Sequence, residues 1–141
     1  MRPSHGLLLV VLLLLAFTGR YTFLQSLNEG RVLAGCQLLR EANDSLIQSA
    51  RDHSRDMAEA GHIFHSTLRI GRWLKVGEIV GVGSGVISIF NAFMASVEHR
   101  EIILDCAYDR VAIGIYGSNG SVWITGRFYD ARSLIYVRRQ P

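Results

Sequence analysis

An apolar stripe between residues 77 and 104 limits the folds open to this chain more than any other feature. Its members recur every three or four residues, which places them on one face of a helix: Val86, Ile89, Phe90, Phe93, Met94 and Val97. Ser84 is the expected N-cap of this helix, and Ser96 that of a short second helix that opens with Glu98 and His99. So wide a stripe must be buried against another layer.

Two more helices are expected before this stripe. The first covers residues 23–34 and ends before Gly35, and the second covers residues 43–60 and is stopped by Gly61. On the second helix, His53 falls on the apolar face rather than among the charged residues. Both helices can therefore cover a sheet.

An alternating pattern near the C-terminus predicts a β-hairpin. Apolar residues alternate along residues 111–116 and again along 122–128, and a turn-forming Gly-Ser-Asn-Gly segment covers residues 117–120. Both faces of this hairpin carry apolar side chains, so both need cover. The predicted fold is therefore α+β, a three-layer α-β-α sandwich around a small antiparallel sheet.

Two segments have weaker signals. Ile79 and Val80 form a short apolar segment, and the glycines that follow at positions 81, 83 and 85 are expected to form a loop, because their spacing does not match a phosphate-binding motif. The residues after Asp130 are expected to form one more edge strand or a loose end.

The net charge of +3 does not indicate a nucleic-acid-binding surface, because the excess basic residues lie near the two ends of the chain. Residues 21–130 contain ten Lys or Arg against twelve Asp or Glu. A nucleic-acid footprint needs basic residues clustered on the folded domain. We therefore expect no nucleic-acid partner, and we divide the chain into a leader (1–20), one domain (21–130) and a basic tail (131–141).

The N-terminus has the pattern of an export signal. Arg2 and His5 form a basic start, and residues 7–17 are an unbroken apolar run of eleven. That length suits a signal peptide, whereas a membrane-spanning helix needs roughly 20 apolar residues. The leader is therefore either a cleaved signal peptide or an uncleaved anchor. In both cases the domain is expected outside the cell, secreted or tethered to the outer face of the membrane, with no other membrane contact.

Cys36 and Cys106 fit an oxidising compartment. A bridge between them would close a loop of about 70 residues and would contribute roughly 4 kcal/mol in the chain-entropy model. Two separate buried thiols are the alternative, because spacing along the chain does not show proximity. Two cysteines alone cannot form a four-cysteine zinc site.

Five polar side chains lie on or beside apolar segments and are the candidates for chemistry: His53, His62, His65, Glu78 and His99. Imidazoles and a carboxylate can bind Zn²⁺ or act as general acid and base. None of them has a strong metal-ligand spacing such as H-E-x-x-H. The alternative is that each histidine is hydrogen-bonded at the end of an element and ties the layers together.

A set of short motifs occurs in a fixed order between about Phe23 and Tyr129. They are Leu27-Asn28 with Arg31, Ala50 with His53-Ser54 and Met57-Ala58, Gly61 with His65-Ser66, Gly77-Glu78, Ala92-Phe93-Met94 with Ser96, His99-Arg100 with Ile103-Leu104, and Val111 with Ile113-Gly114. This set resembles the CAP superfamily of cysteine-rich secretory, antigen 5 and pathogenesis-related 1 proteins, in its compact bacterial SCP-like form.

The resemblance implies an α-β-α sandwich with a central cavity, in which His65, Glu78 and His99 match family residues. The second glutamate of the family cavity has no counterpart, because Phe93-Met94-Ala95-Ser96 stands at its place. Two asparagines of the family motifs are also replaced, by Ile79 and Ile102. The implied cavity is a His-Glu-His triad in which metal binding is weaker or absent.

Two functions follow as hypotheses. The first is a non-catalytic extracellular module that requires no cofactor and binds a lipid such as a sterol, another small ligand or a protein partner. The second is a metal-assisted hydrolase or peptidase, in which His65 and His99 hold Zn²⁺ and Glu78 polarises water. A stable extracellular scaffold without a ligand is a third possibility.

Overall fold

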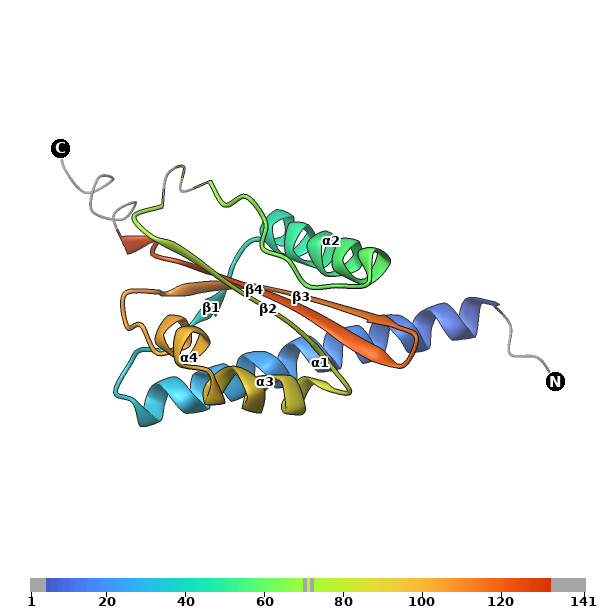
Figure 1. Ribbon diagram of the computed structural model, residues 1–141, viewed down its shortest axis with the longest axis horizontal. Coiled ribbons are helices and arrows are strands. Elements are labelled where there is room, and N and C mark those ends of the chain that lie inside the picture. The colour runs from blue at the N-terminus through green and yellow to red at the C-terminus, as the bar shows by residue number, and fades with distance from the viewer. Residues whose placement is uncertain (1–4, 70, 72, 133–141) are drawn as a thin grey trace.

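The computed structural model describes residues 5–69, 71 and 73–132 and shows a four-stranded sheet between two helical layers (Figure 1). Helices α1 (His5–Leu33), α3 (Val86–Ala95) and α4 (Val97–Ile103) cover one face, and α2 (Asp44–Ala60) covers the other. The larger apolar core lies between α1, α3, α4 and the sheet, and two smaller clusters lie beneath α2. The predicted three-layer sandwich is confirmed.

The sheet has the strand order β1-β3-β4-β2. Its centre is the predicted hairpin, formed by β3 (Arg110–Ser118) and β4 (Ser121–Tyr129) with its turn at Asn119 and Gly120. Strand β2 (Val76–Gly83) pairs antiparallel with β4. The two-residue strand β1 (Arg40–Glu41) was not predicted and pairs parallel with β3, so the sheet is antiparallel except at this edge.

Gly81 and Gly83 do not form the predicted loop, because β2 continues to Gly83, and only Gly85 lies in the short connection before α3. A Cβ atom on Gly81 would lie 2.7 Å from Cζ of Phe93, and one on Gly83 would lie 2.9 Å from Cγ1 of Ile89. Glycine is therefore required at these positions because α3 lies directly on the strand. The prediction of a loop was wrong because it took glycine only as a sign of a turn.

The predicted helix starts are correct for α2 and α4 but not for α3. The side chain of Asn43 caps α2 by accepting a hydrogen bond from the backbone N–H of Leu46. Helix α3 has Gly85 as its N-cap, not Ser84. Ser96 is the N-cap of α4, but its side chain makes no capping hydrogen bond.

Helix α1 is much longer than the predicted helix over residues 23–34, because the apolar leader continues directly into it. Its C-terminal part is buried in the core through Phe23 and Leu27. Its N-terminal part exposes Leu9 and Leu14 to solvent. Within the described residues, no helix combines the length and the hydropathy needed to cross a membrane.

Two sets of interactions fix the C-terminal end of α1 to the segment that follows α4. A disulfide joins Cys36 to Cys106. Beside it, the fully buried guanidinium of Arg31 donates hydrogen bonds of 2.8 to 3.1 Å to four backbone carbonyls, those of Gln37, Ile103, Asp105 and Tyr108. Buried carbonyls need such donors. Arg31 is therefore a structural residue that joins the segment after α1 to the backbone of residues 103–108.

Candidate functional site

The carboxylate of Glu78 is the centre of a buried polar network. Glu78 lies on β2 directly opposite Arg127 of β4, and the two side chains form an ion pair with 2.9 Å between Oε2 and Nε. The backbone N–H of Ser66 donates to Oε1 at 2.9 Å, and Nδ1 of His65 lies 3.0 Å from the same oxygen. The Ser66 hydroxyl donates to Oε2. Both carboxylate oxygens are therefore fully engaged.

The environment of Glu78 keeps it ionised. Burial by itself would raise the pKa of this carboxyl, but hydrogen bonds from Ser66, Arg127 and His65 stabilise the charged form, and the pKa lies below its ordinary value. The side chain of Glu78 is only 2% exposed, whereas that of His65 is 61% exposed. Glu78 is thus a buried, ionised carboxylate at the base of the site, and His65 is the residue of the site that faces solvent.

Arg127 extends the network across the α2 face of the sheet. Its Nη1 donates to Oγ of Ser49 on α2 at 2.9 Å, and its Nη2 donates to Oγ of Ser66 at 3.1 Å. Arg127 and Ser66 were not among the predicted site residues. The signal for Arg127 was present in the alternation of β4, where a charged residue stands on a face that needs cover.

His99 lies apart from this hydrogen-bonded network. Its Nδ1 is 2.8 Å from Oγ of Ser96, and its ring packs against Phe93 with 4.9 Å between ring centroids. Burial lowers the pKa of His99, and its electrostatic interaction with His65 lowers it further. Among the described residues, the structure therefore brings His65 and Glu78 into contact, whereas His99 makes no hydrogen bond to either of them.

His53 and His62 fix the loop that follows α2. The buried ring of His53 has Nε2 2.8 Å from the carbonyl oxygen of Phe64, and the two rings meet edge to face. The ring of His62 also packs against Phe64, with 5.5 Å between ring centroids, and its Nδ1 is 3.1 Å from the carbonyl oxygen of Ala60. Both histidines tie structural elements together and lie outside the Glu78 network.

The residues around Glu78 do not fit a zinc ion. Among the described residues, no group of three or more His, Cys, Asp or Glu side chains is arranged to hold a metal. Both oxygens of Glu78 accept hydrogen bonds, and the cationic Arg127 lies against them. A catalytic zinc site normally has three protein ligands. His65 and His99 alone fall short of that number.

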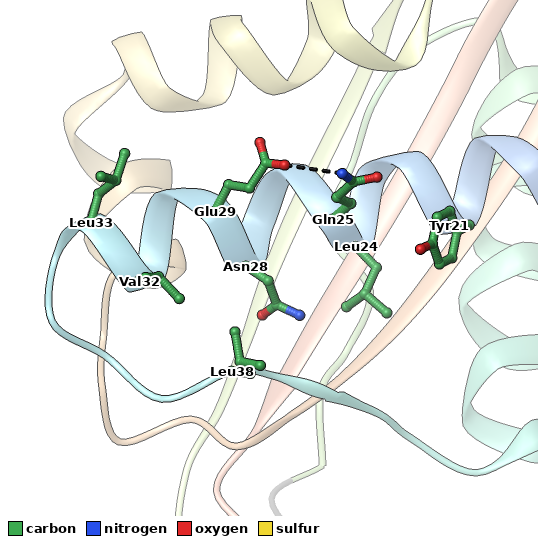
Figure 2. Close-up of a pocket in the computed structure, with 8 residues that line it drawn as sticks. All are labelled: Tyr21, Leu24, Gln25, Asn28, Glu29, Val32, Leu33 and Leu38. Carbon is green, nitrogen blue, oxygen red and sulfur yellow. Dashed lines mark hydrogen bonds between the residues drawn. The ribbon is translucent and has the colours of Figure 1, made fainter.

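A second feature lies on the outer side of α1, where the structure has an apolar groove of about 600 Å³ (Figure 2). Its lining comes from α1 and from the extended segment after it: Tyr21, Leu24, Gln25, Asn28, Glu29, Val32, Leu33 and Leu38. The side chain of Asn28 holds that segment alongside the helix, through a 2.8 Å bond from the N–H of Leu39 and a 3.1 Å bond to its carbonyl. This groove was not predicted from the sequence.

Replacing Glu78 with glutamine is expected to lower the free energy of unfolding at pH 7 by about 2 kcal/mol, because charge-assisted hydrogen bonds are lost and Arg127 stays buried. The folded-state pKa of Glu78 lies below its ordinary value of 4.5. The stabilisation is therefore present above that value and is lost as the pH falls through the lower, folded-state pKa. Denaturant unfolding between pH 3 and pH 8 measures this.

The exposed Glu101 is the matched control, and Glu101→Gln is expected to change the free energy of unfolding by less than about 0.5 kcal/mol. The difference in free energy of unfolding between the wild type and Glu78→Gln is expected to become smaller below pH 4.5. A difference that stays constant down to pH 3 would contradict the assignment of Glu78 as a buried anion.

Comparisons with known proteins agree with this fold. The sequence profile of the cysteine-rich secretory protein (CAP) family matches residues 24–128. No curated protein sequence matches the chain significantly.

Among solved structures, the chain is similar to an extracellular SCP-domain protein of Bacillus anthracis, with 18% identity and a TM-score of 0.70 over 81% of this chain and 41% of that one. The chain thus spans less than half of the Bacillus protein. An outer surface protein of Borrelia burgdorferi is similar at 16% identity and a TM-score of 0.69, over 78% of this chain and 90% of that one. A venom allergen-like protein of Schistosoma mansoni has 8% identity and a TM-score of 0.66, over 79% and 87%.

The TM-scores establish a shared fold, and the profile match establishes the family. The match covers the region that contains the Glu78 network and the disulfide. The chain belongs to the CAP family of cysteine-rich secretory proteins.

Proposed function

We propose that this protein is an exported, non-catalytic CAP module that binds a lipid or another apolar ligand outside the cell. The observation that carries the proposal is the groove along α1, which has the size and the apolar lining of a small-molecule site. Val32 is 57% exposed, Leu33 90% and Leu38 58%. These side chains offer contact area to an apolar ligand.

The Glu78 network supports binding rather than hydrolysis. A carboxylate that activates water needs an oxygen free to receive the proton. Both oxygens of Glu78 accept hydrogen bonds instead, from Ser66, His65 and Arg127. The network holds the loop containing His65 and Ser66 against β2 and β4, which is a structural role.

Binding of an apolar fluorophore and of a lipid panel to the purified protein tests the proposal. We expect Val32→Glu to weaken binding at least about tenfold, because the ligand must then contact a charge. Val97, which is 53% exposed on α4, supplies a matched control, and Val97→Glu is expected to leave binding unchanged.

Failure of every lipid to bind, or equal binding by the two variants, would overturn the proposal. Metal analysis tests the hydrolase alternative in the same preparation. A stoichiometric ion that His99→Ala removes would favour the hydrolase.

A further inference from the structure

Three arginines gather at the β1 edge of the sheet, next to the groove. They line a second hollow of about 500 Å³ together with Asp109 and the segment before β1: Gln37, Leu38, Leu39, Arg40, Asp109, Arg110 and Arg132. Leu38 lines both this hollow and the apolar groove. An apolar surface and a basic surface therefore meet at one residue.

The strand register places two of these arginines side by side. Arg40 of β1 and Arg110 of β3 are direct partners in the parallel ladder, so their side chains leave the same face of the sheet. Like charges directly opposite each other on neighbouring strands are destabilising. An anion placed between the two guanidinium groups would remove this repulsion.

The acidic residues nearby do not neutralise the hollow. Arg110 pairs with Asp109 at 3.3 Å, and Arg132 pairs with Asp130 at 2.9 Å. Asp109 also accepts a hydrogen bond from the N–H of Ala131, and Asp130 accepts one from the N–H of Arg132. Within residues 5–69, 71 and 73–132 the exposed side chain of Arg40 has neither an ion pair nor a hydrogen bond. Asp105 also acts on Arg132 but is itself paired with Lys75, so among the described residues four cations face three carboxylates.

We propose that this hollow binds the phosphate of one anionic phospholipid whose acyl chain lies in the α1 groove. Guanidinium groups match phosphate because they donate paired hydrogen bonds in a fixed fork. The assignment of the acyl chain rests on the proposed function of the groove, whereas the assignment of the phosphate rests on the three arginines alone.

Isothermal titration with short-chain lipids below their micellar concentration tests the assignment. Dihexanoyl phosphatidic acid is compared with dihexanoyl phosphatidylcholine, which has the same chains and no net charge, and with inorganic phosphate. We expect the wild type to bind phosphatidic acid at least about tenfold more tightly than phosphatidylcholine, the equivalent of about 1.4 kcal/mol.

Arg40→Gln is expected to abolish this preference, because the binding of phosphatidic acid, whose phosphate charge is not balanced by a choline, weakens more than that of phosphatidylcholine. Arg51→Gln, an exposed change on α2, is the control and is expected to keep the preference. In phosphate-free buffer, Arg40→Gln is expected to melt at or above the wild-type temperature, because the repulsion with Arg110 is removed. This melting temperature also shows that the variant is folded.

Each remaining outcome identifies which assignment fails. Equal binding of the two lipids by the wild type, or a preference that survives Arg40→Gln, overturns the phosphate site while the groove stands. Binding of inorganic phosphate without either lipid overturns the lipid assignment and the function proposed for the groove. Binding of no ligand at all overturns both.

Discussion

Replacing Arg31 with lysine is expected to lower the free energy of unfolding by about 4 kcal/mol, because several buried carbonyls lose a charged donor at once. Arg31 is fully buried and bonds to four carbonyls, one from the segment after α1 and three from residues 103–108. An ammonium group is a compact donor and cannot reach all of them in the planar geometry of the guanidinium. Urea denaturation followed by tryptophan fluorescence or circular dichroism measures the loss.

Arg55 provides the matched substitution. It lies on the exposed face of α2, within 4 Å of Asp52, Asp56 and Glu59. Surface ion pairs of this kind contribute little, so Arg55→Lys is expected to cost less than about 0.5 kcal/mol. Similar losses for the two variants would show that Arg31 does not organise the backbone around it.

The second large effect is expected at Gly114, where alanine is predicted to cost at least about 3 kcal/mol through overpacking. A Cβ atom at this position would lie 2.1 Å from the carbonyl carbon of Ala50 and 2.2 Å from the backbone nitrogen of Arg51. The obstacle is the backbone of α2, which cannot rotate away. The Ser54 hydroxyl also donates to the carbonyl of Gly114 at 3.1 Å, so the helix cannot shift without losing this bond.

Gly117, on the same strand, tests this explanation. A Cβ atom there would meet nothing within 4 Å, so Gly117→Ala is expected to be neutral or slightly stabilising. Thermal unfolding of the two variants shows whether Gly114 is needed because α2 packs against it or because β3 needs flexible residues in general. A Gly114→Ala protein as stable as wild type would show that α2 can move off the sheet at little cost.

The sequence was sufficient to predict the parts of the fold that depend on local periodicity. The stripe of α3 and the alternation of β3 and β4 are set by the repeat of side-chain direction in each element. The N-cap of α2 at Asn43 and its C-cap at Gly61 also depend only on neighbouring residues. Because both faces of the hairpin are apolar, the three-layer arrangement followed from these elements.

The features that were missed depend on distant partners. Strand β1 is only two residues long and exists because it pairs with β3. Gly81 and Gly83 belong to a strand because they pair with Ile124 and Val122 of β4, and α3 packs on them; nothing in their neighbouring residues shows either contact.

The candidate site was predicted only in part for the same reason. The contact of His65 with Glu78 matches the predicted site, whereas Arg127 became part of it through the register of β2 with β4. Ser66 joined it because the loop folds back onto the carboxylate. Among the described residues, His99 makes no hydrogen bond to His65 or Glu78, and its Nδ1 bonds Ser96 at the start of its own helix.

The order of strands in the sheet has a consequence for the growing polypeptide. The two edge strands, β1 and β2, come first along the chain, and the two central strands come last. A nascent chain that ends before Arg110 therefore has both edges and nothing for either to pair with. Every ladder includes β3 or β4, so no strand of the sheet can pair before synthesis has reached residues 110–129, and the sheet cannot form strand by strand as the chain grows.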